Sequence, residues 1–579
     1  MIEFLTLVVQ STSVVAAPAP RFVESSVALG LDEKSTGRVC VADVNGDDRP
    51  DVIAGRTHVF LNRVDPSTPL GFRFELIDAK LVSPGDDGVA IYCDVDGDRI
   101  PDAVAFRSLD AKKTAERTEK NDTSPIAWWQ HGKGDGTFDA PVAITATTPK
   151  TACAIAAGDV DRDGRTDLFV GNWYSRYGDS VEAYTADLLM NRQGDDGAPR
   201  FERVALPEDA ATFDEEHDLA GRPIYGALIA EVMSRTMHVP PQLVELAYGR
   251  RWNRLYARMP GAEWVDVARD VGFDGDAERS GVYPEFPNVP KRDNEKPFRS
   301  NGNTFDAAVG DVNNDGEFDL FIAEIAHFWA GPSSDRSRFL IAQICDGAQG
   351  VRFATPPEYC VDRLNPNDGS RWNQGDLFAE LVDVDHDGRL DLFLASGDYP
   401  DPPPFDERLR LFHQRDHAGD DGRLFEDVTA ASGIDHKGCG QIALADFDGD
   451  GRMDIVAGQS FMRFTKEMIE AAGGTPKVKL WLNRTDAAPP SIELLLRGDP
   501  AHGIAAQPFG AIVRVTSGDR TLIRQLMGPG GHAGKQSEAI VHAPLAPGAK
   551  AQVEVTWPCT PPRTTKVELG PGRHVIAPR

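Results

Sequence analysis

Short apolar segments rich in small residues recur along most of the chain, and each lies next to an acidic stretch. Segments such as "RVCVA", "TFDAAVG" and "CGQIALA" precede acidic stretches, and "LFV", "LFI", "LFL" or "IVA" follows most of them directly. Apolar runs of this length, bounded by turn-forming residues, are typical of β-strands. Each acidic stretch is therefore predicted to join two strands.

A second pattern combines a strand with a Gly-rich turn and an aromatic residue. It is found in seven places, as "HVFLNR", "AWWQHGKGDGTF", "LLMNRQGDDGAPRF", "NRLYARMPGAEW", "FLIAQICDGAQGVRF", "RLFHQRDHAGDDGRLF" and "KLWLNR". Units of about 50–70 residues with four strands each are typical of a β-propeller, in which radial packing buries both faces of every sheet. The pattern predicts an all-β fold with a seven-bladed propeller over residues 21–487.

The fourth unit departs from the others. "GALIAEVMSRTM" and "PPQLVELAYGRRW" stand where the other units have an acidic stretch, and the spacing of their apolar residues is helical. We therefore predict a helical insertion at about residues 212–253 in this blade.

A third repeated sequence segment indicates how the two ends of the propeller pair. "FVESSVALGLD", "WVDVARDVGFD" and "FEDVTAASGID" each read as an outer strand that leads into the next unit, and no such phrase follows "KLWLNR". The first copy, which begins at Phe22, is predicted to supply the missing outer strand of the last blade and so to join the two ends of the propeller.

The two ends of the chain differ from its middle. Residues 1–20 contain the apolar run "FLTLVV" and the small-residue segment "SVVAAPA", which favours a signal peptide, whereas Glu3 in place of a basic residue leaves a frayed N-terminus as the alternative. Residues 488–579 contain short alternating strands with Gly/Pro turns and are predicted to form a small β-sandwich. No apolar run reaches the ~18 residues that a membrane span needs, so we expect no membrane insertion.

Charge narrows the choice of partners. Asp and Glu outnumber Lys and Arg by 90 to 61, for a formal net charge of −29. Such an excess excludes broad electrostatic attraction to nucleic acids or anionic membranes and makes cations the natural partners.

The acidic stretches themselves form six similar nine-residue loops, which begin at residues 43, 94, 159, 311, 383 and 446. Asp or Asn at positions 1, 3, 5 and 9, with the main-chain carbonyl of position 7, supplies the oxygen ligands that Ca²⁺ prefers, whereas an EF-hand would place a Glu at position 12 between two helices. We expect about six structural Ca²⁺ ions, one per loop. The predicted ligands are Asp43, Asn45, Asp47, Arg49 and Asp51; Asp94, Asp96, Asp98, Ile100 and Asp102; Asp159, Asp161, Asp163, Arg165 and Asp167; Asp311, Asn313, Asp315, Glu317 and Asp319; Asp383, Asp385, Asp387, Arg389 and Asp391; and Asp446, Asp448, Asp450, Arg452 and Asp454.

Over roughly residues 20–485, these loops and turns resemble the FG-GAP/VCBS repeats of integrin α-chain propellers. Residues 509–558, with "GAIVRV", "QSEAIVH" and "VEVTWP", resemble the ASPIC/UnbV domain that follows such a propeller in the cartilage acidic protein family. The resemblance implies calcium in the loops, a secreted, cell-surface or periplasmic location, and a role in adhesion or matrix contact.

The chain contains none of the common catalytic motifs, such as G-x-S-x-G, H-E-x-x-H or a Walker loop. Aromatic and His side chains at Trp173, Tyr174, His327, Trp329 and Tyr399 are expected on the face away from the loops, where they would either bind a sugar or peptide or pack within blades. The sequence thus favours an extracytoplasmic calcium-binding propeller that acts as an adhesion or ligand-binding module for protein or carbohydrate. A sugar-directed lyase or hydrolase with its site in the propeller funnel, and an architectural cell-envelope protein, are the alternatives.

Overall fold

The structure is a computed structural model, and strands dominate it. The residues that it describes are 19–31, 36–179, 181–194, 197–211, 220–233, 240–258, 261–275, 302–326, 335–346, 350–363, 374–397, 407–438, 440–461 and 464–579. Within these residues, no helix is long and apolar enough to cross a membrane.

The strands up to residue 483 pair into seven four-stranded antiparallel groups, six of which are continuous along the described chain. The first three groups are β2 (Val39–Ala42), β3 (Asp51–Ala54), β4 (His58–Val64) and β5 (Phe72–Ile77); β6 (Val89–Cys93), β7 (Asp102–Phe106), β8 (Ala127–Gln130) and β9 (Val142–Ala143); and β10 (Ala152–Gly158), β11 (Asp167–Asn172), β12 (Asp187–Gln193) and β13 (Pro199–Val204). The next three are β14 (Ile224–Ala230), β15 (Gln242–Ala247), β16 (Arg254–Ala257) and β17 (Val265–Asp266); β18 (Thr304–Gly310), β19 (Asp319–Ala326), β20 (Arg338–Ile344) and β21 (Val351–Ala354); and β22 (Gln374–Val382), β23 (Asp391–Gly397), β24 (Glu407–Gln414) and β25 (Phe425–Asp427). The last group consists of β26 (Ile442–Ala445), β27 (Asp454–Ala457), β28 (Lys479–Asn483) and β1 (Phe22–Glu24). The helices are short: α1 (Ser26–Leu29), α2 (Ala111–Glu119), α3 (Ala268–Val271) and α4 (Lys466–Ala471).

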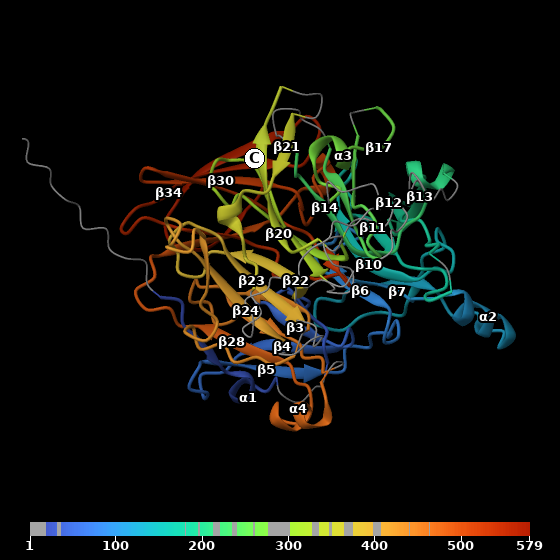
Figure 1. The fold of residues 1–579 in the computed structure, drawn as a ribbon, viewed down its shortest axis with the longest axis horizontal. Helices are drawn as coiled ribbons and strands as arrows, with labels where there is room; N and C mark the ends of the chain where they lie inside the picture. The colour runs from blue at the N-terminus through green and yellow to red at the C-terminus, as the bar shows by residue number, and fades with distance from the viewer. Residues whose placement is uncertain are drawn as a thin grey trace, which may run out of the picture.

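Apolar side chains join each group to the next around a closed cycle. One buried cluster lies between each pair of groups that are consecutive in the chain. A further cluster joins Val41 and Phe60 of the first group to Ala443 and Leu480 of the last, and the blue strands β3 to β5 accordingly lie beside the orange β28 in Figure 1. Small sheets that bury both faces against their neighbours in a cycle are the arrangement of a β-propeller.

The predicted pairing of the two ends of the propeller is confirmed. Strand β1 runs antiparallel to β28, with Phe22 opposite Asn483 and Glu24 opposite Trp481. The other two copies of the same phrase also form outer strands, β17 against β16 and β25 against β24. An outer strand supplied from the other end of the chain links residues that are more than four hundred positions apart.

The predicted helical insertion is wrong where the structure describes it. Residues 224–230 and 242–247 are the paired strands β14 and β15, while residues 212–219 and 234–239 of the prediction lie outside the described residues. Every side chain of β15 is buried, because both faces of this strand contact neighbouring sheets. A strand that is apolar on both faces loses its two-residue alternation, so its periodicity does not distinguish it from a buried helix.

The C-terminal residues form two small sheets that share apolar contacts. One sheet has the order β33 (Val541–Pro544), β29 (Ser491–Leu496) and β36 (Gly572–Ile576), and the other has the order β31 (Arg520–Gln525), β30 (Ile512–Ser517), β34 (Ala551–Trp557) and β35 (Arg563–Leu569). Side chains of both sheets belong to one buried cluster, which extends to the second and third groups of the propeller. Their contacts lie at the acidic-loop end of the propeller: Arg497 Nη2 is 2.6 Å from Asp48 Oδ1, and Ser491 Oγ donates a hydrogen bond to Gly451 O over 2.6 Å.

Residues 528–538, "GPGGHAGKQSE", leave these sheets and enter the centre of the propeller; we call them the central loop. Its short strand β32 (Gly531–His532) pairs with both β10 and β14. The loop contacts the first strand of every group, through Val41 N to Gln536 O, Tyr92 N to Gln536 Oε1, Ala157 N to Pro529 O, the β14–β32 pairing, His532 N to Asp306 Oδ1, Lys535 Nζ to Ala379 O, and Leu444 N to Ser537 Oγ. The C-terminal residues therefore tie the described propeller groups together at their common axis.

Buried ion pairs join this central loop to strands β18 and β22. Lys535 Nζ is 2.9 Å from Asp306 Oδ2 and 3.8 Å from Glu380 Oε1, and the side chains of Lys535 and Asp306 are almost fully inaccessible. Gly534 adopts a φ of +70°, and a Cβ atom there would come within 2.8 Å of Ile91 Cγ2. The close approach of the loop to the inner strands thus requires glycine at this position.

Candidate functional site

All six acidic loops connect the first and second strands of a group, as predicted. In the loop after β10, Asp159 accepts hydrogen bonds from the backbone N–H groups of Asp163 and Gly164, at 3.0 and 2.8 Å. Asp167, the ninth residue, accepts one bond from Val160 N at 2.9 Å and another from Asn191 N on the third strand at 2.7 Å. The last aspartate therefore fixes the loop to two strands at once.

This pair of bonds from the ninth residue is present in every loop. One carboxylate oxygen accepts from the second residue of the loop, and the other accepts from the third strand of the same group or, in the second group, from Gly132 just after that strand. Backbone N–H groups satisfy part of each carboxylate, and the remaining lone pairs stay available to a cation.

In three of the loops, carboxylates predicted as ligands lie close together. Carboxylate oxygens of Asp159, Asp161 and Asp167 lie within 4.8 Å of one another, as do those of the sets Asp94, Asp96 and Asp98 and Asp383, Asp385 and Asp391. Within the described residues, Asp161 Oδ1 and Asp448 Oδ1, both on third positions, are buried and accept no hydrogen bond. An unpaired buried carboxylate oxygen inside an oxygen cluster fits a hard divalent cation.

Burial and mutual repulsion disfavour the charged forms of these carboxylates. Burial raises the pKa of Asp159 to about 8, with Asp163 and Asp161 adding to the shift. Burial likewise raises the pKa of Asp94 to about 7 and that of Asp319 to about 7, and their acidic neighbours act in the same direction. A bound cation offsets this repulsion and favours the ionised carboxylates.

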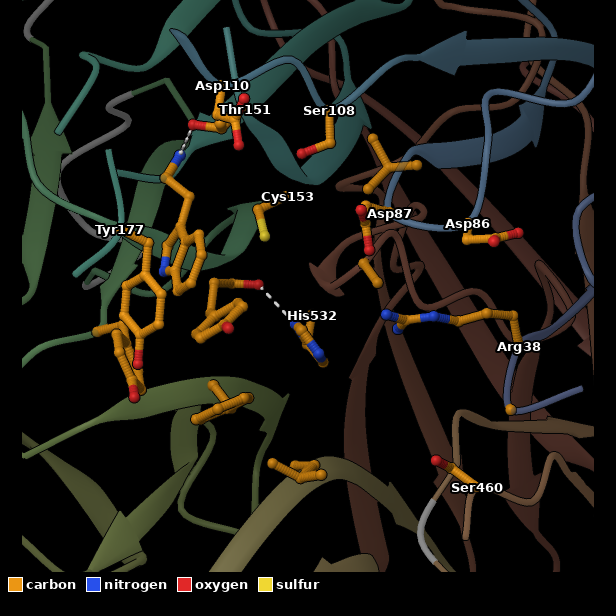
Figure 2. Close-up of a pocket in the computed structure, with 18 of the residues that line it drawn as sticks. Arg38, Asp86, Asp87, Ser108, Asp110, Thr151, Cys153, Tyr177, Ser460 and His532 are labelled. Carbon is orange, nitrogen blue, oxygen red and sulfur yellow. Dashed lines mark hydrogen bonds between the residues drawn. The ribbon is translucent and has the colours of Figure 1, made fainter. Parts of the chain in front are cut away.

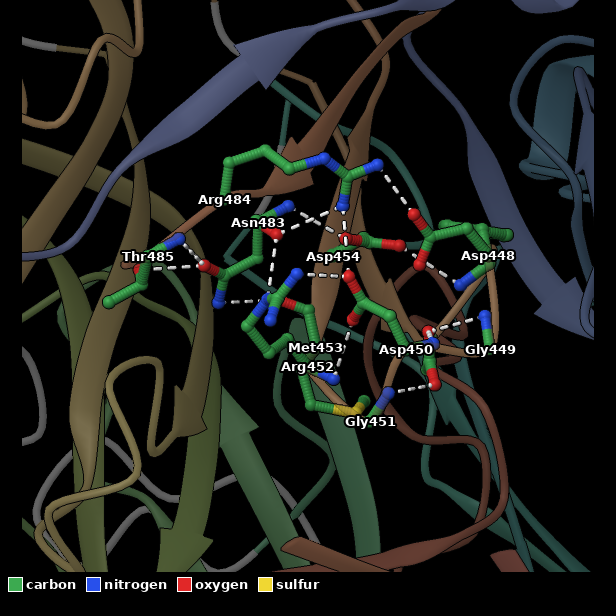
Figure 3. A network of polar contacts seen from close by, with 12 residues as sticks. Asp448, Gly449, Asp450, Gly451, Arg452, Met453, Asp454, Asn483, Arg484 and Thr485 are labelled. Carbon is green, nitrogen blue, oxygen red and sulfur yellow. Dashed lines mark hydrogen bonds and ion pairs between the residues drawn. The ribbon is translucent and has the colours of Figure 1, made fainter. Parts of the chain in front are cut away.

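Several residues on the third strands or directly after them, which the sequence analysis did not select, also face the loops. Arg484 pairs with Asp448 at 2.5 Å and with Asp450 at 3.0 Å (Figure 3), and Arg192 pairs with Asp161 and Asp163 in the same way. In two other loops a histidine takes this place: His131 lies 2.9 Å from Asp96, and His413 lies 3.0 Å from Asp385. These residues stand in the repeated strand-and-turn pattern, in "LNR", "MNRQ", "WQHG" and "FHQR", and that pattern was the available signal.

The side chains at position 7 of the loops pair within their own loop. The guanidinium groups of Arg165, Arg389 and Arg452 turn back to the fifth residue of their own loops, Asp163, Asp387 and Asp450 respectively. The predicted contribution of position 7 through its carbonyl stays a prediction.

A pocket of about 1410 Å³ opens at the other end of the strands, away from the acidic loops (Figure 2). Its lining comes from residues before the first strands and after the second strands of several groups, such as Arg38 before β2 and Trp173 after β11. His532 of the central loop also lines the pocket. The volume exceeds the ~300–1,000 Å³ that is usual for drug-sized ligands, so there is room for an extended ligand.

Aromatic rings form a continuous row along the pocket. The ring centroids of Tyr177 and Trp173 are 4.5 Å apart in a stacked arrangement, and those of Trp173 and Tyr225 are 5.4 Å apart. From Tyr225 the row continues to His532 at 5.1 Å and from His532 to Phe378 at 5.0 Å. Flat rings that line a cavity are suited to stacking against the apolar faces of sugars, and Tyr177 is the most exposed ring of this row.

Two ionisable groups of the pocket are neutral near pH 7. Burial, followed by the positive charge of Arg38, lowers the pKa of His532 to about 3, and Nδ1 of this ring lies 2.9 Å from Tyr225 O. Because a carbonyl only accepts, Nδ1 carries the proton and Nε2 is left as an acceptor. Burial raises the pKa of Cys153 to about 12, which removes the thiolate that a nucleophile needs.

The structure places part of the predicted ligand face in this pocket. Trp173 and Tyr174 both line it, although Tyr174 is buried among other rings. His327, Trp329 and Tyr399 lie outside the described residues. Sequence reasoning missed Tyr177, Tyr225 and His532, which come from different groups or from the C-terminal residues and meet only in the fold.

Comparison with known proteins supports the repeat and the fold. A family model described as FG-GAP-like repeat matches residues 94–170 and 383–457, and both matches begin at the first aspartate of an acidic loop. The chain therefore contains two FG-GAP-like repeats, and together with the cyclic packing they identify the fold as a β-propeller. No curated protein matches the sequence.

Several solved structures show limited similarity. They include the V. cholerae biofilm matrix protein Bap1, at 10% identity over 81% of this chain and 92% of that chain, with a TM-score of 0.33. The Pseudomonas aeruginosa periplasmic gluconolactonase PpgL is 10% identical over 72% of this chain and 91% of that chain, with a TM-score of 0.34. The Penicillium chrysogenum alpha-L-arabinanase complexed with arabinobiose is 11% identical over 74% of this chain and 98% of that chain, with a TM-score of 0.31. Similarity at this level carries no conclusion about function.

Proposed function

We propose that the protein is an extracytoplasmic ligand-binding module: a calcium-stabilised, seven-bladed propeller that binds a carbohydrate in the pocket away from the loops. In this proposal the seven strand groups are the blades, and the two C-terminal sheets are a β-sandwich of the ASPIC/UnbV type. The observation that carries the binding function is the row of rings from Tyr177 to Phe378 along a cavity of about 1410 Å³.

Calcium is assigned a structural role. The donor set consists of carboxylate and amide oxygens on alternate residues of a tight loop, which suits a hard cation of flexible coordination. When bound, the ion supplies positive charge between carboxylates that otherwise repel each other, so its binding energy adds to the folding energy. The extracellular concentration of calcium, in the millimolar range, is sufficient for loops of moderate affinity, which supports a location outside the cytoplasm.

Binding is favoured over catalysis by the state of the pocket's ionisable groups. With a pKa of about 3, His532 is a weak base at neutral pH, and with a pKa of about 12, Cys153 is a thiol. General acid–base chemistry is most efficient when a pKa lies near the working pH. Neither group has the pKa expected of a catalytic base or nucleophile.

Direct titration with carbohydrates tests the binding function. We expect neutral or acidic oligosaccharides to quench the fluorescence of the pocket tryptophan and to release heat in calorimetry, and we expect Tyr177→Ala to weaken binding because it removes an exposed stacking surface. The side chain of Tyr177 is 63% exposed, so its removal should leave the fold intact. Ile344→Ala, at an exposed position on β20, is the matched control. If no oligosaccharide binds, or if both variants behave alike, the proposal is wrong.

A further inference from the structure

The pocket has a basic end. Arg38 lies just before β2 and Arg56 just after β3, and Gly55 N donates a hydrogen bond to Arg38 O over 2.9 Å. Both arginines therefore leave the same pair of strands at the pocket end of the first group, and both line the pocket. Figure 2 shows the guanidinium group of Arg38 directed toward the middle of the cavity, between Asp87 and His532.

The guanidinium of Arg38 has no hydrogen bond or ion pair with any described residue; its one aromatic contact places it 5.9 Å from the centroid of the Phe378 ring. Arg56 donates one bond from Nη1 to the carbonyl of Asp86 at 3.2 Å, and its Nη2 is buried without a partner among the described residues. By contrast Lys113, also at the pocket, is paired with Asp87 at 2.7 Å. Arginine donors that point into a cavity without partners are suited to an incoming anion.

The pocket lining has a different charge balance from the chain as a whole. The protein has a formal net charge of −29, yet the described lining of the pocket carries five basic and four acidic side chains. Burial lowers the pKa of Arg56 to about 10, and the positive charge of Arg38 adds to this shift. Both guanidinium groups stay protonated at neutral pH, and an anion placed between them compensates the cost of their burial and offsets their repulsion.

The basic end and the aromatic row are continuous. Arg38 lies over Phe378, whose ring is 5.0 Å from His532, and His532 leads on to Tyr225 at 5.1 Å. The unprotonated Nε2 of His532 is an acceptor for a hydroxyl group midway along the row. The order along the pocket is thus an anion site, a hydroxyl acceptor and a stacking platform.

We propose that the ligand is an acidic saccharide whose carboxylate or sulfate is held by Arg38 and Arg56 while neighbouring sugar rings lie along the row from His532 to Trp173 and Tyr177. This inference rests on the proposed carbohydrate-binding function and names the class of sugar. Carboxylate and sulfate share the chemistry that matters here, since both accept paired N–H donors from guanidinium groups.

Isothermal titration of the full-length protein in millimolar calcium tests the inference with three probes. These are trigalacturonate, its methyl ester, which keeps the sugar rings but removes the charge, and a sulfated galactose trisaccharide. We expect at least one charged probe to bind about tenfold or more tightly than the methyl ester, because hydrogen bonds between ionised groups are stronger than neutral ones. Tighter binding of trigalacturonate identifies the anion as a carboxylate, and tighter binding of the other charged probe identifies it as a sulfate.

Substitution of the arginines provides the second readout. Arg38→Gln is expected to weaken binding of the charged probe about tenfold to a hundredfold and to leave binding of the methyl ester unchanged. Arg56→Gln should act in the same direction, and Arg563→Gln, an exposed arginine on β35, is the control with the same change in charge. The melting temperature of each variant in calcium identifies any that fails to fold.

Two outcomes separate the inference from the function on which it rests. If the methyl ester binds as tightly as both charged probes, or if neither Arg38→Gln nor Arg56→Gln weakens the charged probe, the acidic class of ligand is wrong while carbohydrate binding stands. If none of the three probes binds and neutral oligosaccharides also fail, both proposals are wrong.

Discussion

Two neighbouring strand groups, β10–β13 and β14–β17, connect their first and second strands in different ways. They share the central strand β32, which pairs with the first strand of each. In the first group the connection from the first to the second strand is the acidic loop, whose ninth residue, Asp167, accepts a hydrogen bond from Val160 N. In the second group the corresponding strand begins with Gln242, whose Oε1 accepts from Val232 N and Met233 N at 2.9 and 3.0 Å.

The comparison shows that the hydrogen bonds of this strand connection do not depend on a charged side chain. A neutral amide at Gln242 performs the hydrogen bonding of Asp167 in a connection whose one acidic residue is Glu231. Buried acids in and next to the second group are instead paired with arginine: Arg254 lies between Glu245 and Glu208, which precedes β14. Glu231 pairs at 2.7 Å with Arg162 of the neighbouring acidic loop. A strand connection at this place does not require carboxylates, and the cation that we propose for the six loops would account for their repetition.

The largest expected loss of stability comes from a change in the central loop, which pairs with both groups. Lys535→Ala removes the cation that faces Asp306 and Glu380 in the centre of the propeller and leaves buried carboxylates unpaired. We expect a loss of about 3–5 kcal/mol in the free energy of unfolding, with or without calcium. Denaturant titration measures it, and Lys566→Ala, at an exposed surface pair, is the control. A loss below 1 kcal/mol, on the order of a surface ion pair, would show that the central loop does not hold the groups together.

A smaller loss of stability, which depends on calcium, should distinguish the two groups. Asp161→Asn removes a carboxylate whose Oδ1 has no partner among the described residues, so it weakens one cation site without breaking a turn bond. We expect a loss of up to about 3 kcal/mol in saturating calcium and little change in EGTA. Glu245→Gln in the neighbouring group should destabilise equally in both conditions, because its partner Arg254 lies in the same group, outside any acidic loop. A calcium-independent loss for Asp161→Asn would contradict the assignment of this loop.

The smallest effect is a gain in affinity. Arg192 pairs with Asp161 and Asp163 and therefore competes with a cation for the same oxygens. Arg192→Met should bind calcium about two- to fivefold more tightly, in proportion to the modest strength of partly exposed ion pairs. Calcium titration by calorimetry measures this change, and unchanged or weaker binding would place the ion elsewhere.

Sequence reasoning reached the repeated parts of the molecule and failed where distant residues meet. The acidic loops, their flanking strands and the closing strand at Phe22 were predictable because each repeats a local pattern several times. Strands β14 and β15 were mistaken for helix, since burial on both faces removes the alternation that marks a strand. The role of the central loop could not be predicted, because its partners are spread from Val41 to Leu444 and no local pattern records them.

The pocket illustrates the same limit. Trp173 and Tyr174 were selected as exposed aromatics. The sequence around Arg38, Tyr225 and His532 does not mark them as pocket residues, because they come together only when the groups are arranged around the axis. Likewise His131, just after β8, and His413, on β24, face the loops from positions that the spacing of the acidic residues does not indicate.

Hydrogen exchange in the two neighbouring groups, in millimolar calcium and in EGTA, tests the central claim most directly. The account predicts that removal of calcium speeds amide exchange in residues 152–172, around the Asp159–Asp167 loop, and leaves residues 224–230 and 242–247 nearly unchanged. Elemental analysis of the same sample should give about six calcium ions per chain, one for each acidic loop. Equal exchange in the two conditions, with no bound calcium, would contradict the account and reduce the six loops to acidic turns.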